Sequence, residues 1–204
     1  MVKKTTNNKI NIISLYRANY LAQFHVREIA RLIKKNHATL LPHLKSLERD
    51  KILAVKTVGK NKLYSLNLKN IIAKNYIAIS EIAAANALME EIFLIKKITL
   101  EIFNLNLKGT IILFGSYAKK TFKEDSDIDL FYLGKNTDKD IENIKSVGKI
   151  YGKAINVKRS TLNNFETGLR KKDPLIIEII KKHILLQNSE QFINELWKFY
   201  NERR

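Results

Sequence analysis

The sequence predicts an α+β chain in three parts. Helices and a hairpin are expected over residues 1–68, a helical connector over residues 69–106 and an α/β domain over residues 107–204. Three observations predict this division. The apolar spacing changes from helical to alternating after Asp50, residues 69–105 lack Gly and Pro, and short apolar runs after Gly109 end in polar motifs.

Composition narrows the classes of function. The 204 residues include no cysteine, which excludes disulfides and thiolate metal sites. We find no signal peptide and no uncharged apolar run long enough for a membrane span, so we expect a cytoplasmic protein with no membrane partner. The net charge is +17, and residues 1–68 hold 14 Lys and Arg against 3 Asp and Glu. This asymmetry favours phosphate binding by the N-terminal part, although lysine is abundant throughout.

The spacing of apolar residues in the N-terminal part predicts three helices followed by a hairpin. Pro42 delays the third helix, which we expect to begin near Ala38 or Thr39. Alternation on either side of Gly59 and Asn61 predicts the hairpin. The expected helices cover residues 8–20, 26–33 and 39–49, and the expected strands cover residues 53–57 and 62–66.

This order is that of a winged helix-turn-helix domain. The stretch NHATLLPHLKSLERDKILAVKTVGKNKLYSLN, residues 36–67, resembles the recognition helix and wing of prokaryotic winged-helix transcription regulators. The resemblance implies that double-stranded DNA is a partner, and a protein-interaction module is the alternative. The expected DNA-binding residues are Thr39, His43 and Lys45 on the third helix, Lys60, Asn61 and Lys62 on the wing, and Arg27, Lys34 and Lys35 against phosphates.

The composition of the connector predicts one long helix or two abutting helices. The apolar surface of such a helix must be buried against another domain or a second chain. We therefore expect a homodimer that forms through this helix. The expected apolar stripe is Ile72, Tyr76, Ile79, Ala83, Met89 and Phe93.

The C-terminal part alternates short apolar strands with helices. Polar pairs stand at two strands: Gly115-Ser116 follows the first, and Asp127 and Asp129 belong to the second. The expected strands cover residues 110–114, 126–133, 154–157 and 184–186, and the expected helices cover residues 117–120, 138–147 and 175–180 and a final amphipathic segment that includes Trp197.

The spacing of these polar residues predicts a nucleotide site. Asp127 and Asp129 are two apart on a strand and therefore share a face. Their mutual repulsion predicts a cation between them, Mg²⁺ or Mn²⁺, which leaves room for phosphates. The Gly115-Ser116 bend offers amides and a hydroxyl to the phosphates of ATP or another nucleoside triphosphate. Lys119 and Lys120 either hold phosphates or are solvated.

The stretch FGSYAKKTFKEDSDIDLF resembles the polymerase-beta-like nucleotidyltransferases of the minimal type. Their signature is Gly-Ser, ten residues and Asp-x-Asp, and residues 117–126 supply the ten. The resemblance implies a polymerase-beta-like α/β domain with Asp127 and Asp129 as catalytic metal ligands. The family's third carboxylate falls at Asn156, an amide that cannot accept a proton.

This departure leaves several readings open. Lys158 shares the face of Asn156 and could partly neutralise the acid pair, and Asp125 or Glu166 are other candidate acids. The whole chain resembles archaeal proteins that join a winged helix to this domain. The first hypothesis is a DNA-binding transferase that moves a nucleoside monophosphate to a hydroxyl of a protein or nucleic acid, in a regulatory or toxin-antitoxin role. The second is a transcription regulator that binds nucleotide without turnover.

Overall fold

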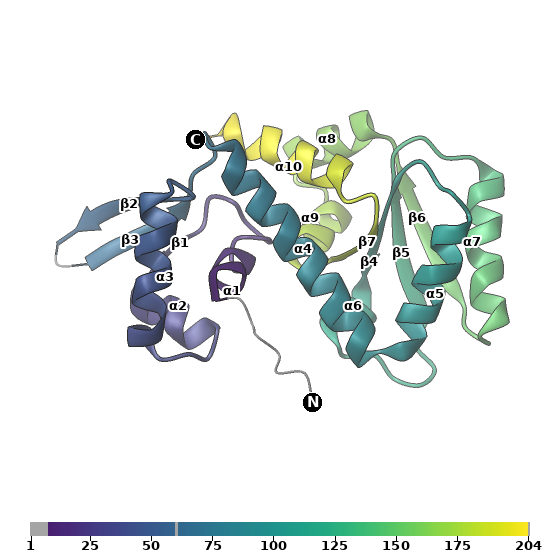
Figure 1. Cartoon of the computed structure of the whole chain (residues 1–204). Coiled ribbons are helices and arrows are strands. Elements are labelled where there is room, and N and C mark those ends of the chain that lie inside the picture. The colour runs from purple at the N-terminus through teal and green to yellow at the C-terminus, as the bar shows by residue number, and fades with distance from the viewer. Residues whose placement is uncertain (1–7, 60, 204) are drawn as a thin grey trace. The chain divides into compact units, whose positions relative to one another are not determined.

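The computed structural model describes residues 8–59 and 61–203, which form two compact units (Figure 1). The first unit contains the described residues up to Ser80 and from Tyr200 onward, and the second contains Glu81–Phe199. Within the described residues, no helix is both long and apolar enough to cross a membrane.

The first unit combines three helices with a small antiparallel sheet of order β1-β3-β2. Asn36 caps α3 by accepting a hydrogen bond from the amide of Ala38, and Lys34 has a φ of 53° in the turn that precedes it. Leu40, Leu44 and Leu47 bury the inner face of α3. The elements are α1 Asn8–Ser14, β1 Gln23–His25, α2 Val26–Leu32, α3 His37–Arg49, β2 Leu53–Val58 and β3 Asn61–Leu66.

Two details of this unit correct the sequence-based expectations. The first helix ends at Ser14 rather than near Tyr20, because the chain turns there and buries Tyr16, whose hydroxyl donates to the carbonyl of Tyr64. The third helix begins at His37, so Pro42 lies in its second turn. There the proline lacks the amide that would bond to the Ala38 carbonyl. The hairpin is confirmed, with Val58 paired to Asn61.

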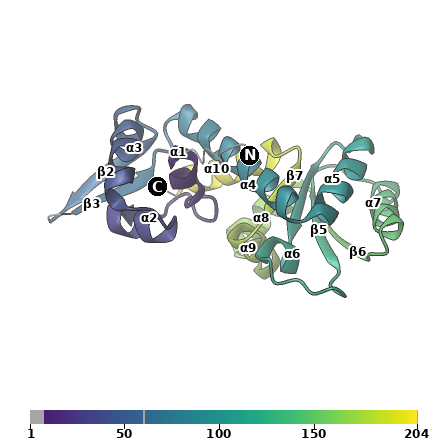
Figure 2. The ribbon, with the colours of Figure 1, turned by 60° about the horizontal axis from the view of Figure 1, so that its bottom comes forward.

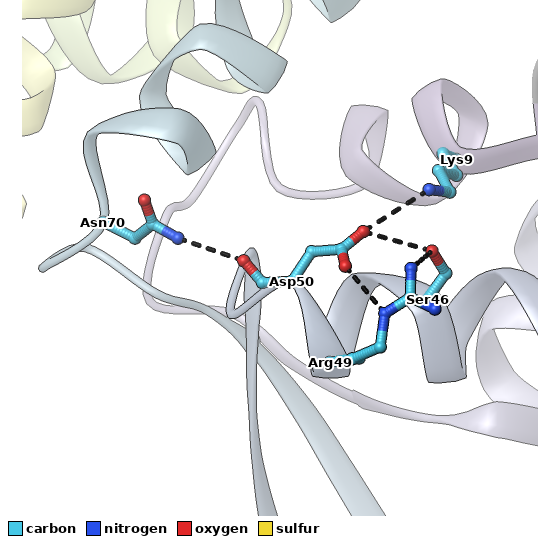
Figure 3. A network of polar contacts seen from close by, with 5 residues as sticks. All are labelled: Lys9, Ser46, Arg49, Asp50 and Asn70. Atoms are coloured by element: carbon cyan, nitrogen blue, oxygen red, sulfur yellow. Dashed lines mark hydrogen bonds and ion pairs between the residues drawn. The ribbon is translucent and has the colours of Figure 1, made fainter.

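Asp50 fixes the end of α3 within the first unit (Figure 3). Its carboxylate accepts hydrogen bonds from Arg49 Nε at 3.0 Å and Ser46 Oγ at 3.2 Å, and Lys9 of α1 lies at 3.7 Å. The hydrogen bond from Arg49, followed by that from Ser46, lowers the pKa of Asp50 despite some desolvation. Asn70 also donates to the carbonyl of Asp50 at 3.3 Å.

The connector forms two abutting helices, α4 Ile71–Glu91 and α5 Phe93–Asn104. The predicted apolar stripe is largely uncovered in the single chain, because Ile72 and Ile79 are about half exposed and Phe93 is 63% exposed, so its role as an interface with a second chain stays a prediction. The buried face is rotated by roughly one residue, about 100° of helix. The first part of α4 is apolar around most of its circumference, so its sequence carries little directional signal. The apolar residues of α4 that are buried are Ala73, Ile77, Ala85 and Leu88.

A four-stranded sheet of order β6-β5-β4-β7 organises the second unit. Strands β5 and β6 are parallel, and the other neighbours are antiparallel. Helices α5 and α7 lie on one side of this sheet and α8 and α9 on the other (Figures 1 and 2). The elements are β4 Thr110–Phe114, α6 Gly115–Lys119, β5 Ile128–Leu133, α7 Asp138–Ile150, β6 Ile155–Ser160, α8 Leu162–Lys171, α9 Pro174–Lys181, β7 Ile184–Gln187 and α10 Glu190–Asn201.

Both faces of β5 are buried along most of its length. Leu130 and Tyr132 belong to the core beneath α5 and α7. Phe131, on the opposite face, packs on Phe165 of α8, and Phe165 in turn packs on Phe192 of α10. Helix α8 supplies much of this second layer and was missed in the sequence.

A buried polar pair joins two distant segments of the second unit. His183, which is 3% exposed, places Nε2 at 3.2 Å from Oε1 of Glu81, which is 1% exposed. The other ring nitrogen, Nδ1, lies 3.1 Å from the carbonyl oxygens of Ile179 and Ile180. His183 follows α9, which ends at Lys181.

We predict that Phe165→Ala destabilises the second unit by about 3–5 kcal/mol, because it leaves a cavity between two aromatic neighbours. Urea unfolding followed by the fluorescence of Trp197, the single tryptophan of the chain, measures this change. Phe103→Ala is the matched control, since Phe103 of α5 is 64% exposed. Equal midpoints for the two variants would contradict the packing described.

Candidate active site

The pairing of three strands brings the polar motifs together. Asp129 on β5 pairs with Phe114, the last residue of β4, on one side. On the other side it pairs with Asn156 of β6. Gly115, which follows Phe114, and Asn156 therefore flank Asp129 from opposite directions across the sheet.

Gly115 lies against the carboxylate of Asp129. Its φ is +68°, and an added Cβ would lie 2.3 Å from Oδ2 of Asp129. A glycine is therefore required here both by backbone conformation and by space. Ser116 follows in the first turn of α6 and is half-buried.

The loop between α6 and β5 is held at both ends. Phe122 stacks on Tyr117 with ring centroids 4.3 Å apart and planes 6° from parallel. The amide of Lys123 donates to Oγ of Ser126 at 2.8 Å. These contacts fix the chain just before Asp127, which directly precedes β5 and is exposed.

The two acids are bridged by an amide rather than a third acid. Nδ2 of Asn156 donates to Oδ2 of Asp127 at 3.1 Å. Burial, and then the negative charges of Asp127 and Glu178, raise the pKa of Asp129, while a hydrogen bond from Asn156 and the charge of Lys158 act in the opposite direction. Asn156 and Lys158 therefore balance only part of the negative charge that is concentrated at this site.

This donor set fits one divalent cation held jointly with phosphates. Among residues 8–59 and 61–203 no group of three or more His, Cys, Asp or Glu could hold a metal ion. Mg²⁺, however, usually takes only one or two carboxylates and completes its shell with water and substrate phosphates. Asp127 and Asp129 supply that pair, and the unfavourable burial of Asp129 as an anion favours a cation beside it.

Both candidate phosphate-binding lysines of α6 and its C-cap are engaged in ion pairs. Nζ of Lys119 lies 2.6 Å from Oε1 of Glu178 on α9. Lys120, which adopts a left-handed conformation, pairs with Glu91 on α4. Each lysine would have to exchange its carboxylate for a phosphate in order to bind nucleotide.

Glu178 is the acidic residue near the site that sequence analysis missed. Its charge raises the pKa of Asp129, and it holds Lys119. The two acids considered from the sequence have other surroundings: Glu166 on α8 pairs with Arg170 and Lys198, and Asp125 is exposed in the loop. Glu178 occurs in an apolar helix far along the chain, so no local motif marks it.

The predicted DNA-binding residues lie in the first unit, and most are exposed. Lys62 is paired with Glu48 of α3 at 3.1 Å, and His43 is half-buried with Nε2 at 3.1 Å from Asn8. Lys60 lies outside the described residues. The exposed candidates are Arg27, Lys34, Lys35, Thr39, Lys45 and Asn61.

Two surface hollows of the first unit have basic lining residues in common. Arg27 and His37 line both a hollow of ≈ 580 Å³, which extends to Lys62, and one of ≈ 430 Å³, which extends to Lys34 and Lys35. His37 is the first residue of α3 and was not among the predicted candidates. Its position could have been found only with the correct start of this helix.

Comparison with known proteins finds a family that matches part of the second unit. Residues 94–186 match the family described as "Nucleotidyltransferase domain". The C-terminal half of the chain contains a nucleotidyltransferase domain. A relative from Methanocaldococcus jannaschii bears the name "Putative protein adenylyltransferase MJ1305" and is 34% identical over 100 residues, which cover 46% of this chain and 65% of that protein. No solved structure matches the chain.

The match spans the segment in which Gly115, Asp127, Asp129 and Asn156 come together. The sequence-based expectation of a nucleotidyltransferase domain in this half is therefore confirmed. The chain covers slightly less than two thirds of the relative's length.

We predict that Gly115→Ala weakens ATP binding by at least about tenfold, because the added methyl displaces the Asp129 carboxylate and strains the backbone. Isothermal titration of ATP in the presence of Mn²⁺ measures the loss. Gly59→Ala is the control, because Gly59 also has a positive φ, +58°, but nothing lies within 4 Å of its added Cβ. Unchanged affinity in Gly115→Ala would show that this bend does not contact nucleotide.

Proposed function

We propose that the chain is a metal-dependent nucleotidyltransferase that moves a nucleoside monophosphate from a nucleoside triphosphate to a hydroxyl acceptor. The observation that carries the proposal is the contact of the Gly115 bend with Asp129, beside Asp127 and Asn156. The name of the M. jannaschii relative supports a protein acceptor and an adenylyl group as one form of this reaction.

In the proposed reaction the acceptor oxygen attacks the α-phosphorus of the triphosphate. A new P–O bond forms, the bond to the bridging oxygen breaks, and pyrophosphate leaves with that electron pair while the hydroxyl proton passes to solvent. Asp127 and Asp129 would hold Mg²⁺ or Mn²⁺, which when bound supplies positive charge for the phosphate oxygens. Gly115 and Ser116 orient the phosphates, and Lys119 would leave Glu178 to bind them.

A second candidate function is nucleotide binding without turnover. Asn156 favours it, because an amide bridges Asp127 and cannot take up the proton of an attacking hydroxyl. In this form the chain is a transcription regulator whose C-terminal domain binds nucleotide without turnover.

For the first unit we propose a winged helix-turn-helix domain that binds double-stranded DNA. Support comes from the order of α1, β1, α2, α3 and the β2–β3 hairpin, and from the β1-β3-β2 sheet. The solvent-exposed Thr39 and Lys45 of α3 would face the groove, and exposed Arg27, Lys34 and Lys35 would face phosphates. On this proposal, the protein regulates transcription or acts as one member of a toxin-antitoxin pair.

A homodimer belongs to the same proposal. Ile82 of α4 is 54% exposed and Phe93 of α5 is 63% exposed, so apolar surface of the connector is available to a second copy. Two copies would present two recognition helices to two half-sites in DNA.

We expect the protein to transfer label from α-labelled ATP, or another labelled triphosphate, to an acceptor in the presence of Mg²⁺ or Mn²⁺. Chelation by EDTA and the Asp127→Ala/Asp129→Ala variant should each abolish this transfer, because both remove the cation from the phosphates. Asn156→Asp, which offers a third carboxylate, should accelerate it. Triphosphate binding without transfer, both in the unsubstituted protein and in Asn156→Asp, would favour the sensor.

We expect a mixed-sequence DNA duplex to bind with a steep salt dependence, measured by gel shift at several salt concentrations. Lys34→Gln/Lys35→Gln should lower the slope of log affinity against log salt by about 1.8, since each phosphate contact contributes about 0.9. Lys171→Gln/Lys181→Gln removes the same charge from the second unit and serves as control. An equal loss in both variants would indicate nonspecific attraction by net charge.

A further inference from the structure

A lysine of β6 lies on the face of the sheet that carries the acid pair. Asn156 pairs with Asp129 across the two parallel strands. Two residues further along, Lys158 pairs with Phe131. Because alternate residues of a strand share a face, Lys158 is on the same side of the sheet as Asn156 and Asp129. Two residues along and one strand across amounts to about 8 Å between the backbones of Lys158 and Asp129, a distance that a lysine side chain can span.

Lys158 differs from the cations of α6 and its C-cap in having no carboxylate partner. Lys119 and Lys120 are both engaged in ion pairs. Within the part of the chain that the structure describes, Lys158 forms no ion pair, and it is exposed. Burial raises the pKa of Asp129, and the charge of Lys158 is one of the effects that lower it, so this charge acts on the acid pair through space. The ammonium group is therefore available to an anion that binds beside Asp129.

A second divalent cation would find few ligands at this site. In many enzymes of phosphate chemistry two ions about 4 Å apart stabilise the attacking and the leaving oxygens, and protein ligands must hold both ions. Among residues 8–59 and 61–203, no third His, Cys, Asp or Glu completes a metal-binding group with Asp127 and Asp129. Asn156 directs Nδ2 at Oδ2 of Asp127, so a hydrogen-bond donor lies where a second ion would need a carboxylate.

The charges on this face suit a single divalent cation. Asp127 and Asp129 carry two negative charges, and Lys158 carries one positive charge. One divalent cation therefore leaves the group with a single positive charge, which attracts a triphosphate. Three carboxylates with two divalent cations would reach the same total. An amide in place of an acid and an added lysine together contribute two positive charges, as many as a second divalent cation.

We propose that this site holds one divalent cation and that Lys158 takes the place of a second, binding an oxygen of the reacting phosphate from the β6 side. This inference rests on the proposed transferase function and assigns a further substrate-binding residue to it. Asp129 lies between β4, which ends at the Gly115 bend, and β6, which carries Lys158. A phosphate above the acid pair can therefore meet the bend on one side and the ammonium group on the other.

An ammonium group performs one part of the role of a second ion. It supplies positive charge and three hydrogen-bond donors to phosphate oxygens. It cannot coordinate the attacking hydroxyl and make it more acidic, as a metal ion can. The proposal therefore implies firm binding of the triphosphate together with slow transfer.

The first measurement is the electron paramagnetic resonance spectrum of Mn²⁺ bound to the full-length protein with a non-hydrolysable ATP analogue. Two Mn²⁺ ions about 4 Å apart couple magnetically, and their spectrum differs from that of an isolated ion. We expect an isolated ion in the unsubstituted protein. We expect a coupled pair in Asn156→Asp/Lys158→Ala, which provides a third carboxylate and removes the ammonium group. Identical spectra from the two proteins overturn the proposal.

The second measurement is the affinity for ATP in the presence of Mn²⁺, by isothermal titration. Lys158→Gln should weaken binding about tenfold, the size of one hydrogen bond to a charged group, and Lys158→Arg should retain most of the affinity. Lys149→Gln is the matched control, because it removes the same charge from an exposed position on α7, which covers the other face of the sheet. Equal affinity in Lys158→Gln and Lys149→Gln overturns the proposal.

Failure of the transferase function gives a different result, because neither measurement depends on turnover. An isolated Mn²⁺ ion, combined with label transfer that does not require Asp127 and Asp129, would contradict the transferase function and not the assignment of Lys158.

Discussion

The contact between a glycine bend and a carboxylate constrains the rest of the second unit. Antiparallel pairing of Phe114 with Asp129 sets the register of β4 and β5, and with it the distance from Gly115 to the acid. A slip of one residue would turn Asp129 to the opposite face, into an apolar core. The fully buried strand β4 prevents that slip, because both of its faces pack against helices. Hydrophobic packing thus specifies the geometry of a polar site.

An amide beside two acids alters the charge of the site in a definite way. Asn156 donates one hydrogen bond to Asp127 and adds no negative charge, and Lys158 further reduces the excess. Glu178 restores part of that charge from α9, but it is engaged with Lys119. Compared with a site of three carboxylates, this site would repel phosphates less and would offer no built-in base in the proposed reaction. On that proposal, affinity for nucleotide and speed of transfer would depend on different residues.

Sequence reasoning succeeded where the signal is local. The spacing between Ser116 and Asp127 and the apolar runs on either side were sufficient to place β4, α6 and β5. It failed where the signal depends on the tertiary structure. Helix α4 is apolar around most of its surface, so its buried face is decided by what packs on it. The partners of Lys119 and Lys120 come from α9 and α4, and no motif in either helix indicates Glu178 or Glu91.

The buried Glu81–His183 pair has a consequence for evolution. The two carbonyl oxygens beside Nδ1 of His183 can only accept, so that nitrogen carries a proton. The other ring nitrogen, Nε2, contacts the equally buried carboxyl group of Glu81 at 3.2 Å. A change at one position alone would strand a polar group inside an apolar core. Across related sequences, these two positions, 102 residues apart, should therefore covary.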